Sequence, residues 1–179
     1  MNEELTFRPA TTADTARIVE IIGQAKAQMR ALGSRQWQEG YPAAADITAD
    51  LARGCGWVLT EAVAAADDNP NAQRVIAYGA VVFDGEPAYR DLEGEWLTTG
   101  DYVVVHRIAV ADGAKGRGVA TEFIRRVAML ARRRGIAAFR IDTNFDNGYM
   151  LRLLDAQGFS LCGRVHYASG ERLAYEKQL

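Results

Sequence analysis

A glycine-punctuated basic loop is the part of the sequence whose residue types and spacing best fit a chemical role. A β-branched apolar run, Tyr102–Val110, leads into Lys115-Gly-Arg-Gly118, and a helical pattern starts directly afterwards. The first N–H groups of a helix have no partner inside it, and the helix dipole adds partial positive charge there. Glycines allow an anion to approach the backbone, and Lys115 and Arg117 add formal charge. The loop is therefore a candidate site for a phosphate group.

Several interpretations of this loop compete. The plainest is an ordinary strand-to-helix turn, because short glycine motifs have a high false-positive rate. A dinucleotide fingerprint is disfavoured, since Gly116-Arg-Gly118-Val-Ala-Thr121 matches only the first two glycines and no acidic residue follows at the ribose-binding spacing. A P-loop fails on glycine spacing and lacks the closing Lys-Ser/Thr pair. The remaining interpretation is a cradle for the pyrophosphate of coenzyme A.

The residues around the loop resemble the acetyl-CoA signature of the GNAT N-acetyltransferase superfamily. Ile108-Ala-Val110 and then Lys115-Gly-Arg-Gly118-Val-Ala120 follow the family pattern Gln/Arg-x-x-Gly-x-Gly/Ala. Gly118 and Ala120 occupy the two small positions. Lys115 stands where Gln or Arg is usual, which keeps the charge and departs slightly from the motif.

Two further blocks extend the resemblance over nearly the whole chain. Arg140-Ile-Asp-Thr143, Asn147, Met150, Leu153-Leu154 and Gly158-Phe159 resemble the family's fifth strand, fourth helix and the start of its sixth strand. Phe7-Arg-Pro-Ala-Thr11 with Asp14 resembles its first strand and first helix. Motifs in the right order are more specific than one loop.

The resemblance implies an N-acetyltransferase that moves the acetyl group of acetyl-CoA directly to a primary amine of a small molecule or peptide. Such an enzyme must hold the thioester, present a neutral amine and stabilise the charge that develops on oxygen. In the family, the donor lies against a splayed central strand whose backbone N–H groups face the thioester. The residues implied to bind the coenzyme are Ile108, Ala109, Val110, Lys115, Gly116, Arg117, Gly118, Val119, Ala120 and Asn147. Asn147 is equally suited to cap a helix.

The motifs do not by themselves assign the groups that would move protons. Many family members carry a tyrosine seven residues after the motif asparagine, but this chain has Leu154 there. A thiol is a good leaving group, so a dedicated acid is not compulsory. His106 is the leading candidate base, since an imidazole accepts protons near neutral pH; the alternative is a histidine bonded within the sheet. Glu95, in the preceding loop, is a second candidate or a solvated carboxylate.

Three aromatic residues are candidates for binding the acceptor. Trp37 and Tyr41 follow the first helix, a region that borders the acceptor site in the family, and Trp96 lies in the loop before the central strand. Each could equally pack its own loop.

Composition limits the remaining classes of function. The chain has 179 residues, 49% hydrophobic and 25% charged, with a net charge of −2. One domain over residues 1–179 is expected. The charge gives no reason to expect nucleic acid as a partner, and no apolar run approaches the length that spans a bilayer. Cys55 and Cys162 are not close-spaced and no signal-peptide pattern is present, which favours the cytoplasm. No metal is implied, and a homodimer is a candidate assembly.

The pattern along the chain alternates strands with helices and predicts an α/β (α+β) fold. Expected strands are Leu5–Pro9, Trp57–Ala62, Val75–Phe83, Tyr102–Val110, Ala138–Thr143, Ser160–Tyr167 and Arg172–Gln178. Expected helices start at Thr11, with Asp14 as a capping partner, and span Ala45–Arg53, Gly118–Arg134 and Tyr149–Gln157. Asp67–Asn71 reads as a turn, and Asp84–Gly100 as a long functional or mobile loop. With the resemblance, this gives a mixed, twisted sheet of six to seven strands, flanked by about four helices, with a splayed central strand.

Two other functions remain open on sequence grounds. A module that binds acyl-CoA without turnover is suggested by the absence of a tyrosine at position 154, and release of free thiol from acetyl-CoA with an amine panel separates it from an enzyme. A purely structural domain is disfavoured by the intact glycine loop. The acceptor itself is not specified, because fold does not fix substrate.

Overall fold

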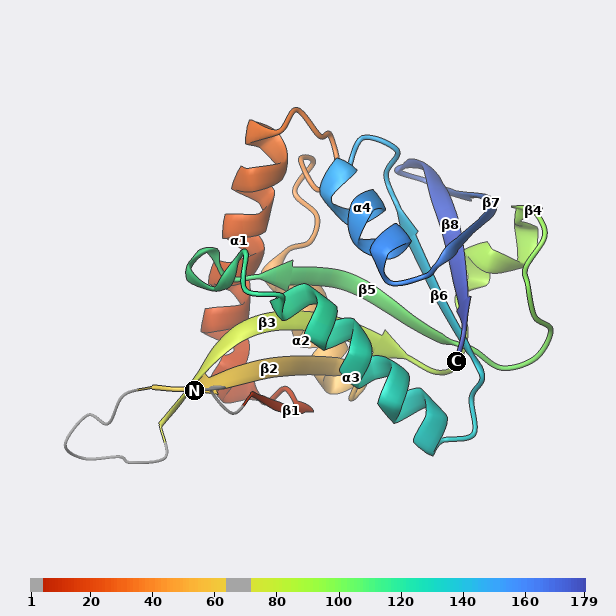
Figure 1. Ribbon diagram of the computed structural model, residues 1–179. Helices are drawn as coiled ribbons and strands as arrows, with labels where there is room; N and C mark the ends of the chain where they lie inside the picture. Colours follow the sequence, from red (N-terminus) through yellow and green to blue (C-terminus); the bar gives the residue numbers. More distant parts are fainter. Residues whose placement is uncertain (1–4, 64–71) are drawn as a thin grey trace. The chain divides into compact units, whose positions relative to one another are not determined.

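The computed structural model describes residues 5–63 and 72–179, and its ribbon is shown in Figure 1. The predicted turn at Asp67–Asn71 lies outside the described residues. The helices are α1 (Thr15–Ala31), α2 (Ala44–Ala52), α3 (Val119–Arg133) and α4 (Gly148–Ala156), with short 3-10 turns at Thr12–Asp14, Pro87–Asp91 and Asp112–Ala114. The strands are β1 (Thr6–Pro9), β2 (Gly56–Ala62), β3 (Gln73–Val82), β4 (Glu93–Gly94), β5 (Val103–Val110), β6 (Ala138–Thr143), β7 (Ser160–Tyr167) and β8 (Gly170–Gln178).

The strands form one mixed sheet in the order β1-β2-β3-β5-β6-β8-β7-β4. This confirms the predicted α/β class, and the strand count exceeds the predicted six to seven because of β4. The chain divides into two compact units, each assembled from three separate stretches. The first contains residues 1–28, 37–80 and 107–123, and the second contains 29–36, 81–106 and 124–179.

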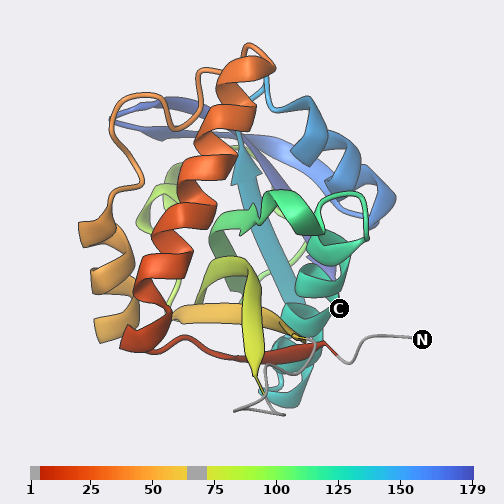
Figure 2. The same cartoon turned by 90° about the vertical axis from the view of Figure 1, so that its left-hand side faces the viewer.

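The first unit is built on the antiparallel strands β1, β2 and β3, which lie side by side in Figure 1. Figure 2 shows α1 and α2 on one face of these strands and the first turn of α3 on the other. Because successive side chains of a strand point to opposite faces of the sheet, these strands contribute packing residues to both faces. Phe7 stacks on Trp57 at 4.7 Å and meets the edge of Phe123 at 5.3 Å on the α3 side. On the opposite face, Tyr78 lies fully buried against α2.

The entry into α1 is fixed by the predicted pair of Thr11 and Asp14. The carboxylate of Asp14 accepts the Thr11 backbone N–H at 2.8 Å and the Thr11 hydroxyl at 3.1 Å. Arg8 donates two hydrogen bonds to the same carboxylate, at 2.8 and 2.9 Å. The hydrogen bonds from Arg8 lower the pKa of Asp14 below its usual value. One buried carboxylate therefore ties β1 to the first helix.

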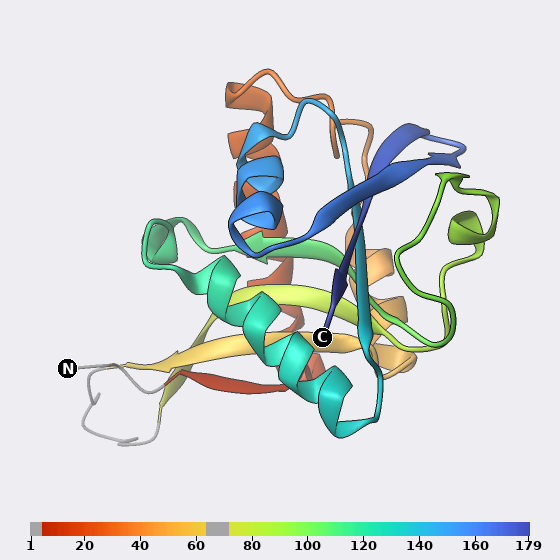
Figure 3. The same cartoon turned by 45° about the vertical axis from the view of Figure 1, so that its right-hand side comes forward.

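The second unit contains the β6-β8-β7-β4 part of the sheet, shown most openly in Figure 3. Glycines allow β4 to pair with β7, since Gly94 and Gly163 face each other with φ of 146° and 153°. A Cβ on Gly94 would lie 2.1 Å from the carbonyl oxygen of Cys162, so no other residue fits. In this unit, the parallel pairing of β5 with β6 covers only Val103–Val104 with Phe139–Arg140. Beyond these residues, the described part of this unit has no further pairing between the two strands, and the splay of the central strand stays a prediction.

The segment Asp84–Gly100, expected from its length to be a functional or mobile loop, is held in place by a buried ion pair. Glu176 is 0% exposed and accepts the backbone N–H of Leu97 at 2.6 Å and the hydroxyl of Thr98. Arg140 lies 3.4 Å from Glu176 and donates to the Thr98 carbonyl at 2.9 Å. Its guanidinium also lies 4.2 Å from the centre of the Trp96 ring. The segment carries a 3-10 turn and β4, and its position on β6 and β8 is defined.

We predict that Asp14→Asn lowers the free energy of unfolding by about 1 kcal/mol at pH 7, a modest value because Arg8 is one-third exposed and solvent screens the pair. The lowered pKa of Asp14 makes its contribution fully present above the unfolded-state value of about 3.9. That contribution is lost as the pH falls through the folded-state value. Urea unfolding of both proteins between pH 2 and 7 measures the difference.

Glu39→Gln, at an exposed carboxylate, is the matched control and should leave stability unchanged at every pH. A stability difference for Asp14→Asn that is the same at pH 2 and pH 7 would show that the charge of Asp14 contributes nothing.

Candidate active site

The Lys115–Ala120 turn has the backbone geometry of an anion site. Gly116 and Gly118 adopt φ of 74° and 75°, the left-handed region that favours glycine. A Cβ at either position would meet no atom within 4 Å, so the space beside this backbone is open. The helix α3 begins at Val119, and its first i to i−4 bond joins the Glu122 N–H to the Gly118 carbonyl at 2.9 Å. The preceding N–H groups therefore have no acceptor within the helix.

The two cations of this turn are both ion-paired. Lys115 pairs with Asp112, three residues before it. Arg117 donates to Glu61 of β2 at 2.6 Å, and Arg74 of β3 donates to the other oxygen of Glu61 at 2.6 Å. Burial disfavours the Glu61 carboxylate, but the hydrogen bonds from the two arginines outweigh it and lower the pKa of Glu61. Three cations against two carboxylates leave a net charge of +1, so the backbone contributes more to the attraction of an anion than the sequence suggests.

The strand that leads into this turn changes backbone conformation at Arg107. This residue has φ of 59°, although it is neither glycine nor at the end of β5. The three residues predicted to face the thioester follow directly: Ala109 is buried, whereas Ile108 and Val110 are half-buried. After β5, the Ala111 N–H donates to the Ile76 carbonyl at 2.8 Å.

Asn147 caps α4, the geometry that its residue type equally suggested. Its side-chain oxygen accepts the Met150 N–H at 3.1 Å, and its side-chain nitrogen donates to Gln36 at 2.9 Å. The residue is 9% exposed. The observed hydrogen bond gives Asn147 the role of a helix cap. Its contact with a coenzyme stays a prediction.

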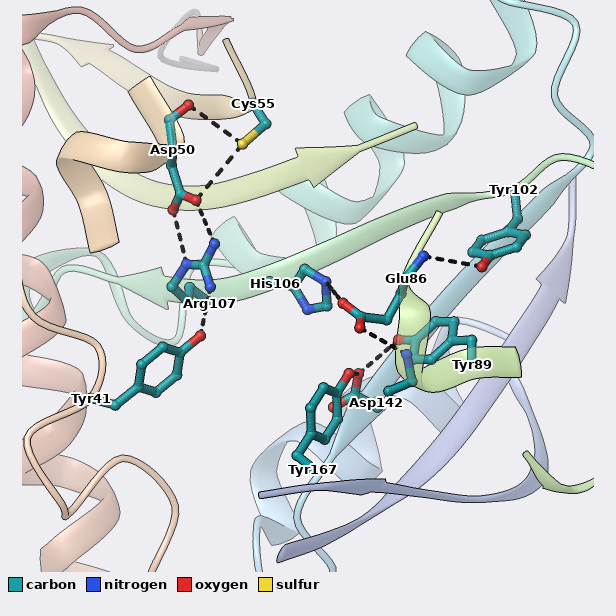
Figure 4. A network of polar contacts seen from close by, with 11 residues as sticks. Tyr41, Asp50, Cys55, Glu86, Tyr89, Tyr102, His106, Arg107, Asp142 and Tyr167 are labelled. Carbon is teal, nitrogen blue, oxygen red and sulfur yellow. Dashed lines mark hydrogen bonds and ion pairs between the residues drawn. The ribbon is translucent and has the colours of Figure 1, made fainter. Parts of the chain in front are cut away.

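In the second unit, His106 pairs with a carboxylate that the sequence did not single out. Its Nε2 lies 3.0 Å from Glu86, and the two side chains are 19% and 17% exposed. Glu86 is held from two sides, because its other oxygen accepts the Ala88 N–H at 3.1 Å and its own N–H donates to the Tyr102 hydroxyl at 3.1 Å. Figure 4 shows the imidazole turned toward this carboxylate. His106 is therefore bonded to a side chain and not to the backbone of the sheet.

Asp142 is the centre of a second group of polar contacts in the same unit. One of its oxygens accepts the Tyr89 hydroxyl at 2.7 Å and the Tyr167 hydroxyl at 2.9 Å (Figure 4). Burial and the nearby Asp142 carboxylate raise the pKa of both tyrosines, so their hydroxyls stay protonated donors. Ile141 is buried, whereas its neighbour Asp142 is half-buried and engaged in these contacts.

The remaining predicted residues are placed as follows. Glu95 has an exposed side chain, and its backbone N–H donates to the Cys162 carbonyl at 3.1 Å. Trp96 stacks on Arg140, and its indole N–H donates to the Tyr89 carbonyl at 3.1 Å. Trp37 is half-buried with φ of 63°, and Tyr41 is 44% exposed with its hydroxyl bound by Arg107 at 2.5 Å.

Position 154 belongs to the core. Leu154 is 0% exposed on α4. A tyrosine hydroxyl at this place would have to be buried and the ring accommodated in filled space. The packing around position 154 therefore suits leucine rather than the tyrosine that the family usually has there.

Sequence reasoning missed Glu86, and one signal for it was present. Glu86 precedes Pro87, and a proline at the first position of a helical turn with an acidic residue before it is a start signal. The pairing of Glu86 with His106 joins residues 20 apart in the chain, which no local pattern shows.

Within residues 5–63 and 72–179, no group of three or more His, Cys, Asp or Glu side chains is arranged to hold a metal ion. No helix in that same part of the chain is long and apolar enough to cross a membrane.

Comparison with known proteins identifies the class. The model of the acetyltransferase (GNAT) family matches residues 26–159. An acetyltransferase of the GNAT family from Streptococcus agalactiae 2603 is 31% identical, with 99% of each chain covered and a TM-score of 0.83. The corresponding GNAT protein from Listeria monocytogenes 4b F2365 is 18% identical, with 99% of this chain and 96% of that chain covered and a TM-score of 0.75. A search of curated proteins finds no match.

A chain from the NatC complex bound to Gag peptide and CoA has the same fold. It is 16% identical, with 98% of this chain and 99% of that chain covered and a TM-score of 0.61. The chain described here belongs to the acetyltransferase (GNAT) family, and it is an acyltransferase. The resemblance drawn from the sequence motifs is confirmed.

We predict that Asn147→Ala lowers the free energy of unfolding by about 1 kcal/mol, because the first turn of α4 loses its capping acceptor. Asn147→Asp keeps an oxygen at the same place and should retain most of the stability, since Asp caps helices as well as Asn does. Thermal unfolding of the three proteins gives the comparison. Equal losses in both variants would show that the bond to Gln36, and not the cap, stabilises this region.

Proposed function

We propose that this enzyme transfers the acetyl group of acetyl-CoA directly to a primary amine of a small molecule or a peptide. The observation that carries the proposal is the Gly116–Gly118 turn at the start of α3, with left-handed glycines and open space beside them. Backbone N–H groups at a helix N-terminus suit a pyrophosphate. The NatC chain of the same fold was solved with CoA and a peptide, which supports this class of donor and acceptor.

The thioester would lie along the backbone of Ile108–Val110. Ordered N–H groups in a partly buried strand can stabilise the charge that develops on the carbonyl oxygen. The leaving thiolate of coenzyme A is stable enough near neutral pH to depart without a dedicated acid. This fits a chain in which position 154, where the family usually carries that acid, is a fully buried leucine.

His106 would accept the proton of the amine, with Glu86 as its partner. The Nε2 atom that faces Glu86 carries the hydrogen in the neutral imidazole, so Nδ1 is left as the acceptor. As Nδ1 takes the proton, the carboxylate of Glu86 stabilises the imidazolium that forms. His106 precedes Ile108 by two residues on β5. Glu95 remains the second candidate, and its exposed side chain makes it the weaker one.

The acceptor amine would be held by Trp37, Tyr41 or Trp96, as the family resemblance suggested. Each of these rings is already engaged in the fold or partly exposed. Substitution of one ring at a time, read as the KM of the amine, ranks them.

We predict that Gly118→Ala weakens binding of coenzyme A, because the left-handed turn that presents the backbone is strained by any side chain. Gly135→Ala is a matched control: Gly135 has φ of 74°, ends the same helix and also has open space at its Cβ position. Calorimetric titration with coenzyme A should show a loss of about tenfold or more for the first variant and none for the second. Unchanged affinity in Gly118→Ala would place the pyrophosphate elsewhere.

We predict that His106→Gln lowers turnover by about 10²-fold, the scale of a lost general base. Glu86→Gln should lower kcat while the KM for acetyl-CoA stays the same, since Glu86 acts on the imidazole and not on the donor. Glu95→Gln serves as the comparison. If His106→Gln keeps the wild-type turnover while Glu95→Gln loses it, Glu95 is the base.

A further inference from the structure

Arg107 has a backbone conformation that its residue type disfavours. It lies inside β5 with φ of 59°, where residues with a side chain rarely stay unless the surrounding structure fixes them. The next three residues are the ones proposed to face the thioester. Whatever holds Arg107 in this conformation also determines where their backbone N–H groups point.

The Arg107 side chain is held by three hydrogen bonds. Its guanidinium donates from Nε to one oxygen of Asp50 at 2.9 Å and from Nη2 to the other at 2.5 Å, a two-point contact that fixes orientation (Figure 4). Its Nη1 donates to the Tyr41 hydroxyl at 2.5 Å. The side chain is 13% exposed, so little water competes for these bonds.

Asp50 is itself fixed in place. It lies on α2, is 2% exposed and accepts the Tyr78 hydroxyl of β3 at 2.5 Å. Its backbone carbonyl accepts the Cys55 N–H at 3.0 Å, just beyond the end of α2. Asp50 therefore joins α2, β3 and β5 through one buried carboxylate. A buried charge of this kind is costly unless fully paired, and here both oxygens are used.

We propose that Asp50 and Arg107 are positioning residues, which hold β5 in the left-handed conformation that aims the backbone of Ile108–Val110 at the acyl donor. The inference rests on the proposed function, since it takes those three residues to face the thioester. In the proposal neither side chain has to touch the donor, because the guanidinium is already directed to Asp50 and Tyr41. If residue 107 relaxed to an ordinary strand conformation, only the fraction of molecules with a left-handed residue 107 would bind coenzyme A. The apparent affinity for coenzyme A would fall by that fraction.

A glycine substitution at position 107 distinguishes this positioning role from direct binding of an anionic substrate by the guanidinium. Arg107→Gly and Arg107→Ala remove the same guanidinium, but glycine adopts a positive φ without strain and alanine does not. Both are made in an Asp50→Asn background, so that no unpaired carboxylate is left buried. If the guanidinium bound an anionic substrate directly, the two variants would be equally impaired.

The measurements are calorimetric titration with coenzyme A and the steady-state KM values for acetyl-CoA and the amine. The Ala variant should bind coenzyme A roughly 5- to 30-fold more weakly than the Gly variant, the left-handed penalty expressed as an equilibrium factor. Its KM for acetyl-CoA should rise while the KM for the amine stays the same. Tyr78→Phe, which removes one hydrogen bond to Asp50 and leaves Arg107 in place, should show a smaller change in the same direction.

Thermal unfolding and near-UV circular dichroism establish that each variant is folded. If the Asp50→Asn chains do not fold, the same Gly and Ala pair is compared in the wild-type background. Equal affinities for coenzyme A in folded Gly and Ala variants would overturn the positioning role while leaving the proposed function intact. A wild-type protein that does not bind coenzyme A would overturn the proposed function, and this inference with it.

Discussion

The early end of pairing between two parallel strands is the constraint to which much of this structure responds. Within the second unit, β5 pairs with β6 only at Val103–Val104 and Phe139–Arg140, although β5 continues in that unit to His106 and β6 to Thr143. Backbone groups that lose a ladder partner must find another, or be kept for a ligand. In the second unit, the side chains just past this point are polar and engaged: His106 with Glu86, and Asp142 with two tyrosines.

Buried charge is used throughout to hold segments that lack regular structure. Glu176 and Arg140 are almost completely buried, and an apolar pair of similar size would be no less stable in principle. The charged pair adds directional hydrogen bonds, because Glu176 accepts the backbone N–H groups of Leu97 and Thr98. The loop that carries Glu86 and Trp96 is thereby fixed without a helix or a long strand. Asp50 with Arg107 does the same for a bend inside β5.

The sequence allowed most of the architecture to be predicted because local signals and global fold agree. The helical period of the apolar residues on α3 matches its buried face, with Val119, Phe123 and Val127 buried and Leu130 half-buried, and Gly135 follows the helix with a positive φ. The Thr11–Asp14 cap was visible as a three-residue spacing. β4 was not, since it has only two residues, one of them a glycine that reads as a loop signal. The partners of His106 and Arg107 were also invisible, because Glu86 and Asp50 are 20 and 57 residues away and their pairing depends on tertiary structure.

The carboxylate of Glu61 changes what kind of anion site the basic turn is. It already neutralises half of the combined charge of Arg117 and Arg74 from a buried position in β2. Attraction between formal charges is screened by salt, whereas fixed N–H groups in contact with a phosphate are screened far less. A phosphate bound here would therefore owe little of its affinity to long-range attraction, and its binding would change little with ionic strength. Such a site would recognise an anion by direct contact with the backbone rather than by long-range electrostatic attraction.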